Sequence, residues 1–265
     1  MMRHILVLIA ALLAVPAAAQ TDQRAAARDV AKKWQEAIVN VRVVLKTRMS
    51  MAGREMQASD DTVEAIGTVI DPSGLTVMSL GMLNPAGMMS KMIGGMAGGD
   101  QKVEITSEPS DLKMRMADGK EIPAKIVLRD EDLDLAFIRP TSKPDKTLTA
   151  INLGDAAKPT ILDQVVVLSR LGRVGAWAPG AALFDISAII ERPRTFFVLS
   201  GQAATMGAPA FLPSGKVVGL LTLRQIDAGR PSMMSMMGGS ESLGLLAVIL
   251  PAADVLEIAN QAMEK

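Results

Sequence analysis

The sequence predicts an all-β protein with a helix near each end. Between residues 41 and 251, short apolar segments alternate with turns that contain Gly or Pro, which is typical of an antiparallel barrel or sandwich. Helical periodicity is confined to the two ends of the chain. The chain has no cysteine and is 49% hydrophobic, so an apolar core rather than disulfides must hold the fold.

The first 19 residues have the features of a secretory signal peptide. Arg3 supplies a positive charge, residues 5–15 form an apolar run too short to cross a bilayer, and alanines occupy residues 17–19. We therefore expect a mature chain from Gln20 that is periplasmic or secreted. No cysteine follows the apolar run, so a lipoprotein anchor is excluded, and we expect no stable insertion into a membrane.

Charge and composition exclude several classes of function. The chain carries 28 basic and 28 acidic residues, so nothing indicates a basic face for nucleic acid. The single histidine is His4, inside the predicted signal peptide, and tyrosine is absent. The mature chain would therefore lack the usual general base, the soft zinc ligands and any cysteine nucleophile. We predict no cofactor.

The first half begins with a helix over residues 20–40. Ala26, Val30, Trp34 and Ile38 recur every four residues and would share one face. Strands are then expected at residues 41–46, 63–71, 75–80, 111–119, 120–130 and 133–139. Residues 84–100 are rich in Met and Gly and predict an insertion loop.

The second half repeats this style after a polar, Pro-containing linker at residues 140–150. Strands are expected at residues 161–170, 182–190, 194–200, 216–224 and 243–251, and a helix at 252–265. A second Met-rich loop, residues 232–239, separates the last two strands.

Five segments, read in order, resemble the HtrA/Deg branch of the trypsin-like serine proteases. They are GTVIDPSGLTVMS at 67–79, ADGKEIPAKIVLRDEDLDLAFIR at 117–139, LGDA at 153–156, MGAPAFLPSGKVVGLLT at 206–222 and LGLLAVILPAADVLEIANQ at 243–261. The resemblance covers residues 25–262. It implies a chymotrypsin/trypsin-like double β-barrel, with the first barrel at 41–139, the second at 151–251 and no PDZ domain.

The resemblance also locates the positions of the catalytic triad. The position of the family's histidine is occupied by Gly81, that of its aspartate by Asp134 and that of its serine by Met206. The neighbouring positions of the oxyanion loop are Ala204, Thr205 and Gly207. A thioether has no proton to lose and forms no acyl intermediate. The sequence therefore predicts a pseudoprotease.

Two other chemical interpretations remain open from the residues alone. Ser214 and Lys216 lie close enough in sequence for a Ser-Lys dyad, so an active endopeptidase with an unrecognised nucleophile is an alternative, although PSGK at 213–216 is also a typical hairpin turn. The acidic residues of 130–134 offer oxygen ligands for Ca²⁺, although such clusters are usually solvated loops.

Methionines cluster in the two Gly-flanked loops. The clustered residues are Met88, Met89, Met92, Met96, Met233, Met234, Met236 and Met237. Flexible thioethers suit the binding of varied peptides, and we expect polypeptide or a partner protein as the ligand, bound by β-augmentation. Alternatives are a Cu(I) site, a sink for oxidants and a surface insertion without a ligand. A homo-oligomer is a further possibility.

Overall fold

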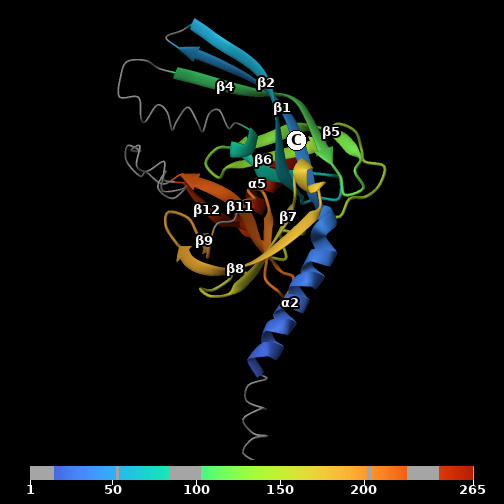
Figure 1. The fold of residues 1–265 in the computed structure, drawn as a ribbon, viewed down its shortest axis with the longest axis vertical. Helices are drawn as coiled ribbons and strands as arrows, with labels where there is room; N and C mark the ends of the chain where they lie inside the picture. Colours follow the sequence, from blue (N-terminus) through green and yellow to red (C-terminus); the bar gives the residue numbers. More distant parts are fainter. Residues whose placement is uncertain (1–14, 52–53, 84–102, 202–204, 226–244, 265) are drawn as a thin grey trace, which may run out of the picture.

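The computed structural model describes residues 15–51, 54–83, 103–201, 205–225 and 245–264. Two barrels lie side by side, a long helix extends from them at the N-terminal end and a shorter helix closes the chain (Figure 1). The predicted Met/Gly-rich segment 84–100 and the Met-rich loop 232–239 lie outside the described residues.

The first barrel is closed by six antiparallel strands in the order β1-β2-β3-β6-β5-β4. Its elements are β1 (Ile38–Met51), β2 (Arg54–Val69), β3 (Thr76–Ser79), the 3₁₀ turn η2 (Leu80–Leu83), β4 (Val103–Arg115), β5 (Glu121–Asp130) and β6 (Leu135–Pro140). Gly74, at φ 101°, makes the turn between β2 and β3.

The second barrel has the same connectivity, with the order β7-β8-β9-β12-β11-β10. Its elements are β7 (Gln164–Arg170), the 3₁₀ turn η3 (Arg173–Gly175), β8 (Pro179–Ile190), β9 (Phe196–Leu199), β10 (Pro209–Phe211), β11 (Val217–Gln225) and β12 (Leu245–Pro251). In each barrel the first strand pairs with the second and the fourth. The predicted all-β double barrel with two terminal helices is confirmed.

Strand β7 shows how the barrels pack together. Val165 and Val167 belong to the core cluster inside the second barrel, whereas Val166 and Leu168 belong to the cluster that extends into the first barrel. Side chains alternate between the two faces of a strand, so both faces of β7 are buried. This explains the uninterrupted apolar run at residues 165–168.

The N-terminal helix α2 (Val15–Trp34) packs one face on the barrels. Ala27 and Val30 are buried, and the Trp34 ring stacks on Phe211 of β10 at 6.1 Å between centroids. The predicted end of this helix at residue 40 is wrong. A 3₁₀ turn, η1 (Gln35–Ala37), follows α2, and β1 starts at Ile38 because this β-branched segment pairs with β2.

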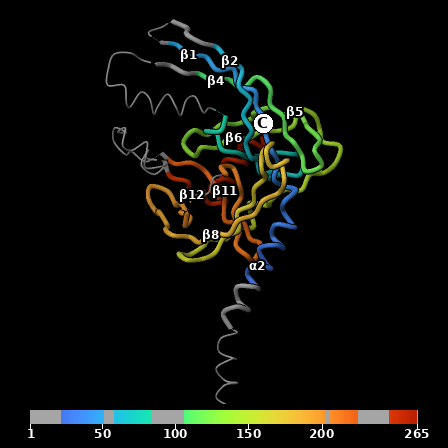
Figure 2. The backbone as a smooth tube through the Cα atoms, viewed as in Figure 1, coloured from blue at the N-terminus to red at the C-terminus, as the bar shows by residue number. Residues whose placement is uncertain are grey.

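The tube trace shows α2 running away from both barrels (Figure 2). Because α2 starts at Val15, it passes through the predicted processing point after residue 19, and signal-peptide cleavage stays a prediction. Within the described part of the chain, no helix combines the length and the apolar character needed to cross a bilayer.

The first strands are longer than the sequence suggested. Beyond the barrel, β1 continues to Met51 with β2 and β4 on its two sides, and Figure 1 shows these three strands projecting from the body. Their polar composition hides the strand pattern. Opposite charges stabilise such pairs across a sheet, and Lys46 stands opposite Asp60 on β2 and Glu108 on β4.

The two halves are joined by residues 141–163, which contain no named strand. In the predicted linker, the Leu148 N–H donates to the Pro72 carbonyl, and Ile151 N–H donates to Val69 just after it. The last helix, α5 (Ala252–Met263), returns to the first barrel, where Arg139 donates to the Ala262 carbonyl.

A buried arginine ties the second barrel to the first. Arg170, at the end of β7, is 8% exposed. Its Nε donates to the Ile38 carbonyl at 2.9 Å, its Nη2 to the Gln35 carbonyl at 2.9 Å and its Nη1 to the Trp177 carbonyl at 3.1 Å. Burial lowers the pKa of this guanidinium, and Glu36 opposes that effect.

Candidate functional site

Asp134 lies where the two barrels meet, and its carboxylate accepts three hydrogen bonds. The Ser79 hydroxyl donates to Oδ2 at 2.6 Å, and the Gly81 N–H donates to Oδ1 at 2.6 Å. From the second barrel, the Leu223 N–H of β11 donates to Oδ2 at 3.2 Å. One carboxylate therefore holds β3, η2 and β11 together.

The backbone around Asp134 is adapted to this position. Its φ is 58°, a left-handed conformation that aspartate tolerates better than most residues. The Asp134 carbonyl also accepts the Leu80 N–H at 2.9 Å. The main chain and side chain of one residue thus bind three consecutive residues, Ser79, Leu80 and Gly81.

Burial raises the pKa of the Asp134 carboxyl above its usual range. The hydrogen bonds from Ser79, Gly81 and Leu223 oppose this rise in pKa, as does the positive charge of Arg224. Burial penalises the charged form, whereas donors favour it. The Asp134 carboxyl is therefore partly buried, and hydrogen bonds from the protein replace those that it would make with water.

Gly81, the position of the family's histidine, touches Asp134 through its backbone alone. Its N–H points at the carboxylate, and no side chain extends toward a substrate. Gly81 and Met206 are both partly exposed. The structure therefore brings positions 81 and 134 into direct contact, and position 81 contributes only a backbone N–H to that contact.

The turn that carries Met206 is locked against the first barrel. Gly207 has φ 85°, and a Cβ there would lie 2.4 Å from the Ile66 carbonyl oxygen, so this position requires glycine. The Thr68 hydroxyl donates to the Gly207 carbonyl at 2.8 Å. The Gly207 N–H donates to the Leu221 carbonyl at 2.8 Å.

The same turn lies beside the Asp134 cluster. A Cβ on Gly207 would lie 3.3 Å from the backbone nitrogen of Ser79, the residue whose hydroxyl binds Asp134. Thr205 accepts the Ala208 N–H within the turn at 3.3 Å. Ala204 lies outside the described residues.

Ser79 is a site residue that sequence reasoning missed. It is 1% exposed, so its hydroxyl serves Asp134 and does not face a substrate. The available signal was its place two residues before Gly81 at the end of an apolar strand, where a buried hydroxyl needs a partner. The Leu223 N–H left no such signal, because a backbone donor does not depend on residue type.

The Ser214 and Lys216 pair forms a turn rather than a dyad. The Leu212 N–H donates to Lys216, and the Gly215 N–H donates to Leu212, both at 2.9 Å, with Gly215 at φ 87°. The Lys216 ammonium lies 3.8 Å from the Asp155 carboxylate. This is the hairpin connection between β10 and β11.

The acidic residues near Asp134 do not converge. Asp130 Oδ1 accepts the Leu133 N–H at 2.9 Å, and the Asp132 carbonyl accepts a hydrogen bond from Arg224. Across the described ranges, no group of three or more acidic or histidine side chains is placed to hold a metal ion. The calcium interpretation therefore finds no site here. The eight clustered methionines, including the proposed peptide or Cu(I) ligands, lie outside the described residues.

Residues 96–220 match the family model of the trypsin-like peptidase domain. The two six-stranded barrels are consistent with the fold of that family. The chain carries a trypsin-like peptidase domain. The match includes Asp134 and Met206, and Gly81 lies N-terminal to it. Comparison with curated proteins gave no match for this trypsin-like chain.

Proposed function

We propose that this trypsin-like domain is an exported, non-catalytic homologue of the HtrA-type serine proteases that binds polypeptide or a partner protein. The observation that carries the proposal is the bonding of Asp134. In a working triad the aspartate orients an imidazole. Here it binds the Gly81 N–H, the Ser79 hydroxyl and the Leu223 N–H, and the residue at the base position has no side chain.

The chemistry at position 206 supports the same conclusion. The methionine thioether has no proton to transfer and forms no acyl intermediate. Loss of the triad leaves roughly 10³–10⁴-fold acceleration over water in well-studied proteases, far below the turnover of a protease. No other histidine can replace the missing base, because the sequence has a single histidine, His4. His4 lies in the predicted signal peptide.

A binding role uses what the domain retains. The surface that contains Gly81 and Met206 corresponds to the place where an active relative holds an extended substrate, and both residues are partly exposed. An extended polypeptide would bind there by adding its backbone hydrogen bonds to the domain. The Met-rich segments 84–100 and 232–239 would add adaptable apolar contacts.

The test uses purified protein with fluorescently labelled, unfolded casein. We expect binding, seen as a rise in anisotropy, without cleavage on gels. Gly81→Trp should weaken binding by about tenfold by filling the surface beside Asp134, whereas Lys125→Trp, on an exposed position of β5, should leave it unchanged. Cleavage of casein would refute the non-catalytic assignment. Unaltered binding by Gly81→Trp would place the polypeptide elsewhere.

A further inference from the structure

A cavity lies between the outer face of the first barrel and the loop that follows β7. Its volume is about 300 Å³, and its lining comprises Asn40, Arg42, Glu64, Arg115, Glu121, Arg173 and Trp177. This volume is at the lower end of the range of ligand sites, about 300–1,000 Å³. The cavity shares no residue with the Asp134 cluster, and its role does not depend on loss of proteolysis.

The wall from the second barrel is a loop held in a demanding conformation. Ala176 and Trp177 have φ values of 50° and 55°, a region that non-glycine residues seldom adopt. Arg170 holds the Trp177 carbonyl, and the Glu64 carboxylate accepts the Arg173 N–H at 2.9 Å. Contacts to both barrels therefore fix this wall.

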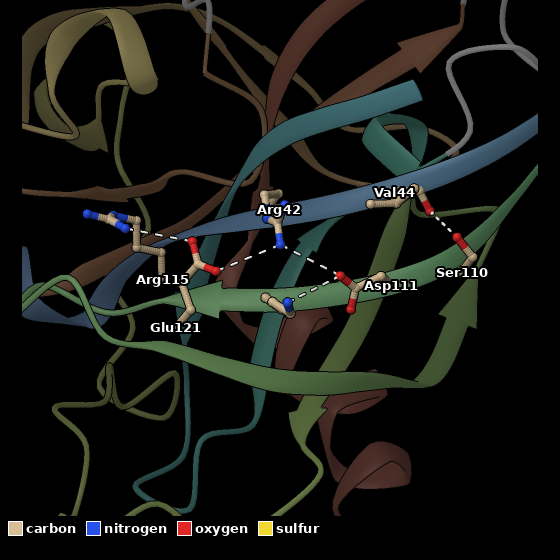
Figure 3. A network of polar contacts seen from close by, with 7 residues as sticks. Arg42, Val44, Ser110, Asp111, Arg115 and Glu121 are labelled. Carbon is tan, nitrogen blue, oxygen red and sulfur yellow. Dashed lines mark hydrogen bonds and ion pairs between the residues drawn. The ribbon is translucent and has the colours of Figure 1, made fainter. Parts of the chain in front are cut away.

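The lining of the cavity carries three arginines, Arg42, Arg115 and Arg173, against two carboxylates, Glu64 and Glu121. Arg42 lies 3.6 Å from Asp111 and 3.8 Å from Glu121, and Arg115 lies 3.7 Å from the same Glu121. Figure 3 shows the Arg42 side chain of β1 between these two carboxylates, with Arg115 beyond Glu121. All three distances exceed a hydrogen bond, so guanidinium N–H groups remain available.

Two buried polar atoms at this cavity lack partners among the described residues. They are Oδ1 of Asn40, a side chain that is only 3% exposed, and Nε of Arg42. The Asn40 amide is oriented by its Nδ2, which donates to the Leu171 carbonyl at 3.3 Å, so its oxygen is the free end. Buried polar groups without partners are uncommon and call for a ligand or water.

Trp177 supplies an aromatic face to the site. The Arg115 guanidinium lies 3.9 Å from the ring centroid, which holds the guanidinium plane in place by a cation–π contact. A guanidinium fixed in this way can offer a pair of parallel N–H groups to a carboxylate.

We propose that this cavity is a binding site for a carboxylate that carries a hydrogen-bond donor on the adjacent carbon. The carboxylate would bind Arg42, Arg115 and the exposed Arg173. The neighbouring N–H or O–H would satisfy Asn40 Oδ1. A free acylamino or hydroxy acid and the C-terminal residue of a polypeptide share this chemistry, since both place a donor beside the carboxylate.

The test is calorimetric titration of the full chain with an N-acetylated alanine tripeptide, its C-terminal amide and N-acetylalanine. We expect the free acid to bind at least about tenfold more tightly than the amide. N-acetylalanine binding as tightly as the tripeptide would identify a small molecule as the ligand. Clearly weaker binding of N-acetylalanine would identify a chain end.

Variants separate this site from general charge effects. Arg173→Ala should weaken binding of the acid about tenfold without affecting the fold, because the Arg173 side chain is exposed and its bond to Glu64 uses the backbone. Lys113→Ala removes a charge that pairs with Asp111 nearby but lies outside the cavity, and should change affinity less than about twofold. Equal binding of acid and amide, no binding of either, or full affinity in Arg173→Ala would overturn the proposal.

Discussion

Asp134 and Arg170 are two charged groups that join the same two barrels, and each belongs to a different barrel. Asp134 belongs to the first barrel and accepts a hydrogen bond from Leu223 of the second. Arg170 belongs to the second barrel and donates to Ile38 of the first. Neither forms an ion pair within the described residues, and each is satisfied by backbone groups, with one added hydroxyl at Asp134.

The two groups differ in the role that resemblance to serine proteases would suggest for them. Arg170 corresponds to no residue of the catalytic triad, so its hydrogen bonds to backbone carbonyls are readily interpreted as structural. Asp134 occupies a catalytic position by resemblance, yet its bonds are of the same kind. An aspartate at that position is therefore poor proof of catalysis, because joining the barrels is reason enough to keep it.

The largest effect should come from removing the Asp134 carboxylate. Asp134→Ala leaves the Ser79 hydroxyl and the Gly81 and Leu223 N–H groups without their acceptor. We expect the free energy of unfolding to fall by about 3–5 kcal/mol, measured by urea denaturation. A loss below about 1 kcal/mol would show that the carboxylate does not join the barrels.

Arg170→Met should cost somewhat less, about 2–3 kcal/mol of unfolding free energy. The methionine keeps part of the apolar stem, and the three freed carbonyls are easier to leave unpaired than N–H groups. The same denaturation series measures it. A cost clearly above that of Asp134→Ala would reverse the ranking of the two groups.

The two charges should act independently. The milder pair Asp134→Asn and Arg170→Lys keeps the side-chain sizes close to the original, so the double variant should still fold. The losses in unfolding free energy should add to within about 0.5 kcal/mol, because the groups share no partner. A larger deviation would mean that the two junctions form one cooperative network.

The pH dependence of stability provides a smaller effect of known sign. Because the folded-state pKa of Asp134 is raised, the folded protein keeps this proton at pH values where the unfolded chain has lost it. The contribution of Asp134 is thus fully present below the unfolded pKa of about 3.9 and is lost as pH rises through the folded pKa.

Wild-type protein should therefore lose stability relative to Asp134→Asn as pH rises above about 4, by at most about 1.4 kcal/mol per pH unit. Denaturation curves of the two proteins at matched pH values give this difference directly. A difference that grows in favour of the wild type would require a lowered pKa, and the burial argument would then be wrong.

The smallest effect should come from restoring the nucleophile alone. Met206 is partly exposed, so Met206→Ser should change the unfolding free energy by less than about 1 kcal/mol. The new hydroxyl has no base to accept its proton, and intact mass after treatment with a fluorophosphonate should show no adduct. An adduct in this variant would reveal a hidden base.

Sequence patterns predicted most of the strands, because each strand buries at least one apolar face. The family resemblance predicted the double barrel and placed Gly81 and Asp134 at triad positions, which the structure brings into contact. They failed where polar residues continue a strand, as in β2 before Val63, and at the end of α2, where sheet pairing from Ile38 overrides helical spacing.

Sequence patterns also could not predict the long-range hydrogen bonds to backbone atoms. The acceptors of Arg170 in η1 and β1 lie 135 and 132 positions away in sequence, and a carbonyl acceptor leaves no trace in residue type. The cavity beside Trp177 likewise depends on how this loop covers the face of Asn40 and Arg115. No local pattern encodes that contact.

The most direct test of the central claim treats wild-type protein and Asp134→Asn alike with a fluorophosphonate, then measures intact mass and stability. If Asp134 is structural, neither protein gains an adduct, and Asp134→Asn has a lower free energy of unfolding than the wild-type protein. An adduct on wild-type protein that disappears in Asp134→Asn would contradict the account, because it would show a reactive serine that depends on this carboxylate.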